Sequence, residues 1–164
     1  MSGAVPGQEA GETKAVIVIA YDGSPSARRA VHHAGRFLVA DRAVVLTVWS
    51  PLDRGTDPVS YDLDGPPDPT DTDEVDIALA EARRVNDEGL ELALTAGLPA
   101  EALCVAQTYT VWGTIIDAAD EVEADLIVTG TRATTGFRSL IQSSVADHVL
   151  RRGHRPVLIV PPGP

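Results

Sequence analysis

Two short stretches of the chain combine the residue types that hold a phosphorylated ligand. The first is Asp22-Gly23-Ser24-Pro25, which ends an apolar run, and the second is the segment 130–144, GTRATTGFRSLIQSS, which follows another apolar run. Small and hydroxylated residues between a buried strand and a helix let backbone amides and hydroxyl groups approach a phosphate, and the helix dipole favours its negative charge. Arg132 and Arg138 are candidates for neutralising that charge. The sequence therefore suggests an anion site built from these two loops.

Both stretches also have a purely structural interpretation. Asp-Gly is a common turn pair, and Ser24 before Pro25 is a helix start. The segment 130–144 lacks the lysine of a Gly-x4-Gly-Lys-[Ser/Thr] phosphate loop, and G-x-G-x-x-G does not occur in the chain. On spacing alone, the small residues of 130–144 are better explained by a tightly packed connection from a strand to a helix.

Other reactive residues indicate neither catalysis nor metal binding. Ser144, Asp147 and His148 are too close together on one expected helix to place a nucleophile, a base and an orienting group correctly. His32 and His33 are neighbours that would point about 100° apart on a helix, which is poor geometry for one metal ion. We expect no catalytic residue and no metal site, and we expect Cys104 to be a core residue.

Apolar runs and periodic patterns predict the elements that carry the two loops. Continuous apolar runs without polar alternation are typical of strands buried on both faces, and apolar residues at the 3.6-residue period predict amphipathic helices. The strands are expected over 14–20, 43–49, 102–106, 126–129 and 156–160, and the helices from Pro25 to near Ala40, over 78–93, over 115–122 and over 144–151. This alternation predicts an α/β fold, with a parallel sheet and helices on both of its faces. Ligands of such folds lie beyond the carboxyl ends of the strands, where both loops are expected.

Three segments together resemble the universal stress protein family. They are AYDGSPSARRAV after the first strand, LTVW in the second, and ADLIVTGTRATTGFRSLIQSSVADHVLRRGHRPVLIVP at the end. The resemblance implies a single open sheet of five parallel strands in the order 3-2-1-4-5, with a fold like that of the adenine-nucleotide alpha-hydrolases. It also implies a homodimer in which the last strands, about 156–160, pair antiparallel. The family domain would span 14–161, after a disordered leader over 1–13 and before a tail over 162–164.

The resemblance assigns ligand-binding roles to particular residues. ATP-binding members carry Gly-x2-Gly-x9-Gly-[Ser/Thr], which falls on Gly130, Ala133, Ser143 and Ser144 of this chain. Asp22 lies where the family's aspartate contacts the ribose. Val48 lies where the family usually contacts the adenine. The full set of expected nucleotide-binding residues is Ala20, Tyr21, Asp22, Val48, Thr129, Gly130, Arg132, Ala133, Ser143, Ser144 and Val145.

Ala133 and Ser143 depart from the glycines of that motif. An alanine held at positive φ costs on the order of 1 kcal/mol, whereas a serine caps a helix well and leaves its amides in place. Neither change removes a hydrogen-bond donor, and each 1.4 kcal/mol lost corresponds to about a tenfold loss of affinity. We therefore expect weakened nucleotide binding rather than none, although the sequence leaves abolition open.

Charge and composition narrow the class of function. Apolar residues make up 44% of the 164 residues, as in a globular domain, and the net charge of −11 argues against nucleic-acid binding. The acidic residues are concentrated in an insert rich in Pro, Gly and Asp, which we expect to be a mobile loop over 50–72. No apolar run approaches the ~20 residues of a membrane span. The single cysteine fits a reducing cytoplasm.

These observations predict a cytoplasmic, dimeric regulator that binds ATP, with AMP or ADP as alternatives and Mg²⁺ as an accompanying ion. Nucleotide binding would change a surface that an unidentified protein partner recognises. Two alternatives stay open: a stress scaffold that binds no nucleotide and works through protein contacts, and a slow ATPase. Efficient catalysis is not expected, because no residue forms a general base with a companion.

Overall fold

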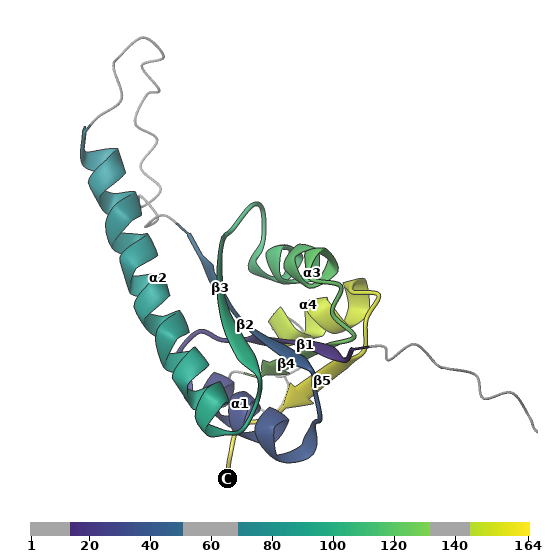
Figure 1. Ribbon diagram of the computed structural model, residues 1–164. Helices are drawn as coiled ribbons and strands as arrows, with labels where there is room; N and C mark the ends of the chain where they lie inside the picture. Colours follow the sequence, from purple (N-terminus) through teal and green to yellow (C-terminus); the bar gives the residue numbers. More distant parts are fainter. Residues whose placement is uncertain (1–13, 51–68, 132–144) are drawn as a thin grey trace, which may run out of the picture.

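A computed structural model describes residues 14–50, 69–131 and 145–164, and it contains one five-stranded sheet (Figure 1). The strands are β1 (Val16–Ala20), β2 (Arg42–Trp49), β3 (Ala100–Ala106), β4 (Leu126–Gly130) and β5 (Val157–Val160). Their order is β3-β2-β1-β4-β5 and every pairing is parallel. The fold and the strand order predicted from the sequence are therefore confirmed.

Two layers of helices cover the sheet. The helices α1 (Pro25–Phe37) and α2 (Pro69–Thr95) pack on one face, and α3 (Val111–Glu121) and α4 (Val145–Arg152) on the other (Figure 1). Alternate residues of a strand point to opposite faces. Ile17 and Ile19 of β1 accordingly join the core beneath α1 and α2, whereas Val18 joins the core beneath α3 and α4. All three are buried, which explains why β1 has no polar alternation.

The start of α1 follows from its sequence. The Ser24 hydroxyl accepts a hydrogen bond from the backbone N–H of Ala27 at 3.2 Å, and Pro25 occupies the first turn, where its missing N–H is not needed. The helix ends at Phe37 rather than near Ala40, because Leu38 takes an extended conformation and donates its N–H to the Ala34 carbonyl. That short connection lets β2 begin at Arg42.

Helix α2 begins earlier than expected, which corrects the predicted loop over 50–72. Its first residue is Pro69, so 69–72 are helical, as is the whole stretch up to Thr95. A proline is tolerated in the first helical turn, and the acidic sequence after it suits the positive end of the helix dipole. The prediction overlooked these signals because the stretch is rich in loop-forming residues. The rest of the insert and the expected leader over 1–13 lie outside the described residues.

A buried amide ties α2 to the sheet. Asn86 is 2% exposed, and its Nδ2 donates to the Val45 carbonyl and to the Thr47 hydroxyl, each at 2.9 Å. The Thr47 hydroxyl in turn donates to the Tyr21 carbonyl at 2.9 Å. One polar chain therefore connects the middle of α2 to β2 and to the end of β1, and buried polar groups joined in this way specify one arrangement of the elements.

We predict that Asn86→Ala lowers the free energy of unfolding by about 2–3 kcal/mol, because it leaves a cavity and removes the donor to buried acceptors. Urea unfolding monitored by circular dichroism measures the change. The control is Asp87→Ala, which truncates the neighbouring exposed residue of the same helix and should change stability by less than about 0.5 kcal/mol. Equal effects of the two substitutions would contradict this account.

Candidate functional site

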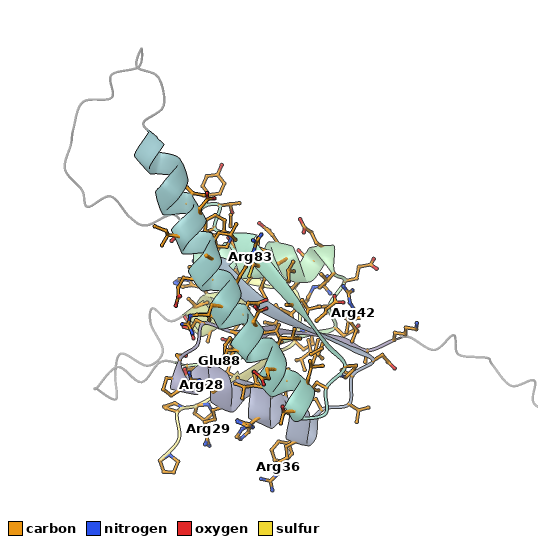
Figure 2. All side chains as sticks on the ribbon, turned by 60° about the vertical axis from the view of Figure 1, so that its left-hand side comes forward. Arg28, Arg29, Arg36, Arg42, Arg83 and Glu88 are labelled. Atoms are coloured by element: carbon orange, nitrogen blue, oxygen red, sulfur yellow. The ribbon has the colours of Figure 1, made fainter. Side chains whose placement is uncertain are left out.

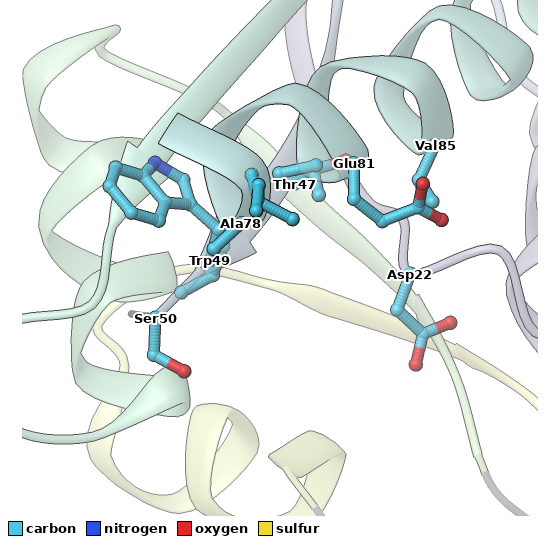
Figure 3. A pocket seen from close by; sticks show the side chains of 10 residues that line it. Asp22, Thr47, Trp49, Ser50, Ala78, Glu81 and Val85 are labelled. Atoms are coloured by element: carbon cyan, nitrogen blue, oxygen red, sulfur yellow. The ribbon is translucent and has the colours of Figure 1, made fainter. Parts of the chain in front are cut away.

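A pocket of about 350 Å³ lies where the carboxyl ends of β1 and β2 meet α2 (Figure 3). Figure 1 shows that α2 continues past the ends of β2 and β3, and the α2 residues that line the pocket lie between Ile77 and Val85. The volume is within the ~300–1,000 Å³ range of small-ligand sites. The lining residues are Asp22, Thr47, Val48, Trp49, Ser50, Ile77, Ala78, Glu81, Ala82 and Val85.

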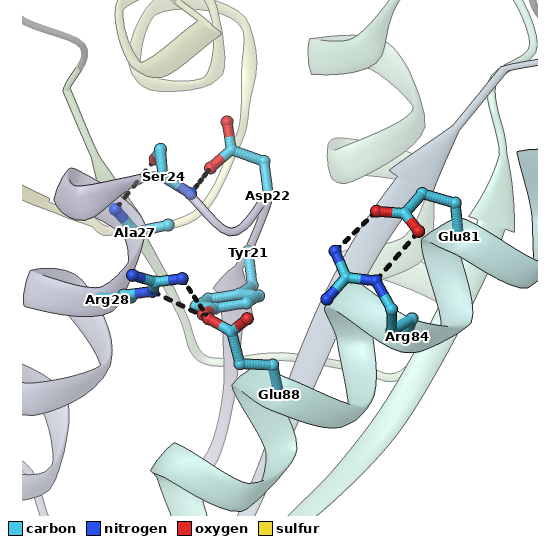
Figure 4. Close-up of polar contacts among 8 residues, drawn as sticks. All are labelled: Tyr21, Asp22, Ser24, Ala27, Arg28, Glu81, Arg84 and Glu88. Carbon is cyan, nitrogen blue, oxygen red and sulfur yellow. Dashed lines mark hydrogen bonds and ion pairs between the residues drawn. The ribbon is translucent and has the colours of Figure 1, made fainter.

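Asp22 stands at the pocket in a well-defined turn directly after β1. One carboxylate oxygen, Oδ1, accepts the backbone N–H of Ser24 at 3.0 Å, and Gly23 between them has φ +77° (Figure 4). Only glycine adopts that conformation without strain, which explains the Asp-Gly-Ser order. The structure therefore shows the turn predicted from the sequence, and the exposed Asp22 side chain lines the pocket.

The end of β2 forms the floor of the pocket. Val48 and Trp49 are half-buried there, and both line the pocket together with Asp22. Thr47 also lines it, but its hydroxyl is already engaged with the Tyr21 carbonyl and with Asn86. Asp22 and Val48, to which the family resemblance assigns the sugar and the base of a nucleotide, both line the pocket, and Val48 also packs against the core beneath α3 and α4.

Helix α2 supplies an apolar wall with one charged group. Ile77, Ala78, Ala82 and Val85 are apolar, and Glu81 stands among them. Arg84 donates to both oxygens of the Glu81 carboxylate, at 2.6 and 2.9 Å, and this bonding lowers the pKa of Glu81 (Figure 4). Among the described lining residues, none carries a positive charge, so the pocket suits an uncharged, partly apolar group better than a phosphate.

The sequence pointed to none of these α2 residues as functional. Ala78, Ala82 and Val85 belong to the apolar face that predicted the helix, and such a face is normally buried against a sheet. The helix start at Pro69 is the signal that could have revealed them, because it makes α2 too long for the strands it covers. Trp49 and Glu81 offered no separate signal in the sequence.

Gly130 occupies the end of β4, and its surroundings explain its identity. A Cβ atom built on it would lie 2.5 Å from the carbonyl carbon and oxygen of Ser26 and 2.9 Å from the Ser26 Cβ. The sequence interpretation was that a glycine here lets the backbone approach a ligand. The structure shows that the glycine is required in the first place for close packing of β4 against the start of α1, whether or not a ligand is present.

The remaining expected site residues fall into two groups. The buried Thr129 donates its hydroxyl to the Gly130 carbonyl, the half-buried Ala20 packs toward α3 and α4, and Val145, 36% exposed, begins α4. These residues and Tyr21 are not among those that line the pocket. Arg132, Ala133, Ser143 and Ser144, like Arg138, lie outside the described residues.

The Tyr21 side chain lies in the core rather than in the pocket. It is 2% exposed, and its hydroxyl donates to Glu88 Oε1 on α2 at 2.5 Å. Arg28 of α1 donates to the same carboxylate oxygen at 2.8 Å from Nε (Figure 4). Burial, and then the bond to Glu88, raises the pKa of the Tyr21 hydroxyl. The bonds from Tyr21 and then from Arg28 lower the pKa of Glu88.

The two described members of the Ser144, Asp147 and His148 group make other contacts. His148 stacks on Trp112 of α3 with the ring centres 5.3 Å apart, and Asp147 pairs with Arg151 at 2.8 Å. In the described part of the chain, no three His, Cys, Asp or Glu side chains are grouped as a metal site. No helix in that part is long and apolar enough to cross a membrane.

A parallel sheet in the order β3-β2-β1-β4-β5, with helices on both faces, defines the class of doubly wound α/β domains, and the pocket lies at the carboxyl ends of its strands. Within that class, residues 15–161 match the universal stress protein family. The chain therefore belongs to the universal stress protein family.

Similar proteins agree with this assignment. A universal stress protein of Methanocaldococcus jannaschii is 44% identical over 46 residues, which are 28% of this chain and 27% of that protein. A universal stress protein solved in complex with cAMP is 24% identical, with a TM-score of 0.64 over 92% of this chain and 98% of that one. The universal stress protein of Archaeoglobus fulgidus, solved in complex with dAMP, is 22% identical, with a TM-score of 0.56 over 90% and 97% of the two chains.

We predict that Gly130→Ala destabilises the protein by about 1–3 kcal/mol in the absence of any nucleotide, because the added methyl group meets the backbone of Ser26. Urea unfolding of nucleotide-free protein measures the effect. Thr131→Ala, which alters the next residue without adding an atom, is the control. Unchanged stability of Gly130→Ala would mean that the glycine serves ligand approach alone.

We also predict a stability loss at high pH that depends on Tyr21. Because the folded protein raises the pKa of this hydroxyl, its contribution is fully present below the unfolded pKa of about 10 and is lost as pH rises through the higher folded value. The free energy of unfolding of the wild type should therefore approach that of Tyr21→Phe above about pH 10. A difference between the two proteins that stays constant from about pH 8 to pH 11 would contradict the assignment.

Proposed function

We propose that this protein binds an adenine nucleotide, with the base and the ribose in the pocket between β2 and α2, and that it acts as a nucleotide-responsive regulator. The observation that carries the proposal is that Asp22 and Val48 line one pocket. Two relatives of the same fold have been solved with cAMP and with dAMP, which supports an adenine nucleotide as the ligand class.

The chemistry of the pocket supports this orientation of the ligand. The flat faces of a base suit the apolar wall of Ile77, Ala78 and Ala82, and a carboxylate such as Asp22 accepts hydrogen bonds from ribose hydroxyl groups. A phosphate would be repelled by Asp22 and Glu81, so the phosphates would extend toward the end of β4 and the start of α4. ATP accompanied by Mg²⁺, or AMP or ADP, fits this arrangement, because the cation would offset the negative charges.

We propose regulation rather than turnover, in a cytoplasmic homodimer. Binding at this pocket would contact β1, β2 and α2 together, so occupancy would stabilise one position of α2 and alter a surface that a protein partner reads. Strand β5 is an edge strand of the described sheet, and its backbone is available for pairing with a second copy. Hydrolysis of ATP, if measurable, would be slow and incidental.

Binding to the protein, stripped of any nucleotide it carries, tests the proposal. The chain has two tryptophans, Trp49 in the pocket and Trp112 on α3, so Trp112→Phe leaves Trp49 as a reporter. We expect AMP and Mg-ATP to change Trp49 fluorescence and to give a calorimetric Kd on the order of micromolar. An absence of heat and of any fluorescence change up to millimolar nucleotide would favour the alternative of a scaffold that binds no nucleotide.

Asp22→Asn sharpens this test, because asparagine keeps an oxygen for the Ser24 N–H but loses the charge. We expect about a tenfold weaker affinity with little loss of stability. Asp41→Asn is a matched control, since Asp41 also accepts a backbone N–H, that of Ala15 at 2.7 Å, before the start of β2. Phosphate release from ATP, measured on the same proteins, separates a regulator from an ATPase: turnover lost in Asp22→Asn would favour the enzyme.

A further inference from the structure

The side chains of Tyr21 and Arg28 converge on one carboxylate oxygen of Glu88 near the pocket. Glu88 Oε1 of α2 accepts a hydrogen bond from the Tyr21 hydroxyl at 2.5 Å and one from Arg28 Nε at 2.8 Å, and it forms an ion pair with a terminal nitrogen of Arg28 at 2.7 Å. Tyr21 directly follows β1, and Arg28 lies on α1. Figure 2 shows Arg28 and Glu88 together where α1 and α2 meet. We call Tyr21, Arg28 and Glu88 the Glu88 cluster.

The Glu88 cluster is placed next to two opposite walls of the pocket. Tyr21 immediately precedes Asp22, and Glu88 follows Val85 by three residues, so it lies about one helical turn farther along α2. Asn86 also links α2 to the end of β1, through the Thr47 hydroxyl and the Tyr21 carbonyl. Strand β2 is held to β1 by backbone hydrogen bonds, but α2 is held to the β1 turn by side chains alone.

The contact between the two walls is also unusually close. A Cβ built on Gly89 of α2 would lie 2.5 Å from Cδ1 of the Tyr21 ring, so only glycine lets α2 approach the ring this closely. One built on Gly23 would lie 3.4 Å from Val85, so the Asp22 turn also lies against α2. The Tyr21 ring therefore lies against α2 at Gly89, and its hydroxyl is bonded to Glu88 on the same helix.

We propose that Tyr21 and Glu88, with Arg28, are positioning residues that hold the α2 wall at a fixed distance from Asp22 and thereby set the affinity of the pocket for the nucleoside part of its ligand. This proposal rests on the nucleotide-binding function proposed above. The cluster does not touch the ligand. It acts through Asp22 on one side and through Ala82 and Val85 on the other.

The charges of the cluster suit this role. Arg28 and Glu88 are partly exposed, with 50% and 32% of their side chains accessible, and a pair of that kind contributes little to overall stability. A buried hydroxyl bonded to a carboxylate is stronger and more directional. The cluster should therefore affect the geometry of the pocket more than the global stability of the fold.

The test compares AMP affinity in variants that remove one bond at a time. Tyr21→Phe keeps the ring against Gly89 but loses the hydroxyl, and we expect its Kd for AMP to rise roughly threefold to tenfold, the range for one hydrogen bond. Glu88→Ala should raise the Kd at least as much, and Glu88→Gln, which keeps an acceptor for Tyr21, should recover most of the affinity. Amide hydrogen exchange over residues 78–85 of α2 should be faster in Tyr21→Phe and in Glu88→Ala, without nucleotide.

Two controls separate positioning from stability. Leu98→Ala removes a buried side chain just before β3, at the opposite end of the sheet, so it should lower stability without changing the Kd. Arg42→Gln breaks an exposed ion pair with Glu101, away from the cluster (Figure 2), and should change neither. Equal affinity of the wild type, Tyr21→Phe and Glu88→Ala for AMP would overturn the proposal, and so would a rise in Kd for Leu98→Ala. A wild type that binds no AMP would instead overturn the proposed function.

Discussion

The position of α2 depends on the buried amide of Asn86, and the pocket depends on the position of α2. Parallel strands satisfy each other's backbone groups, but a helix has no backbone bonds to offer a sheet, so side chains must fix its register. Asn86 donates to the Val45 carbonyl and to the Thr47 hydroxyl, and the Thr47 hydroxyl donates to the Tyr21 carbonyl. Because α2 is held in this way at its middle, its residues from Ile77 to Val85 can form a wall of the pocket.

Close backbone approach is the second constraint on the site, and glycines allow it at two places. Gly130 permits β4 to pack on the start of α1, and Gly89 permits α2 to pack on the Tyr21 ring. Each glycine brings together elements that are far apart in the sequence. A glycine of a phosphate-binding motif can therefore be required by packing alone, and its presence in a sequence does not distinguish between these reasons.

Electrostatics limits what the pocket accepts. The chain carries a net charge of −11, and the described charged groups that line the pocket are the carboxylates of Asp22 and Glu81. Arg84 partly offsets Glu81 without entering the lining. A uniformly anionic ligand is poorly suited to such a place, whereas a ligand with an uncharged, hydrogen-bonding end and a separate anionic end is well suited to it.

The sequence by itself determined the order of the elements, the parallel sheet, the turn at Asp22 and the membership of the family. The first three depend on local patterns, namely continuous apolar runs, a 3.6-residue period, and a proline after a capping serine, whereas the family follows from the resemblance of whole segments. Only the tertiary structure decided that Asp22 and Val48 share a pocket with α2, that Tyr21 points into the core, and that Gly130 is explained by Ser26. The sequence could not show these facts, because an apolar face on a helix looks the same whether a sheet or a pocket lies beneath it. The length of α2 relative to the strands decides between the two, and that comparison exists only in three dimensions.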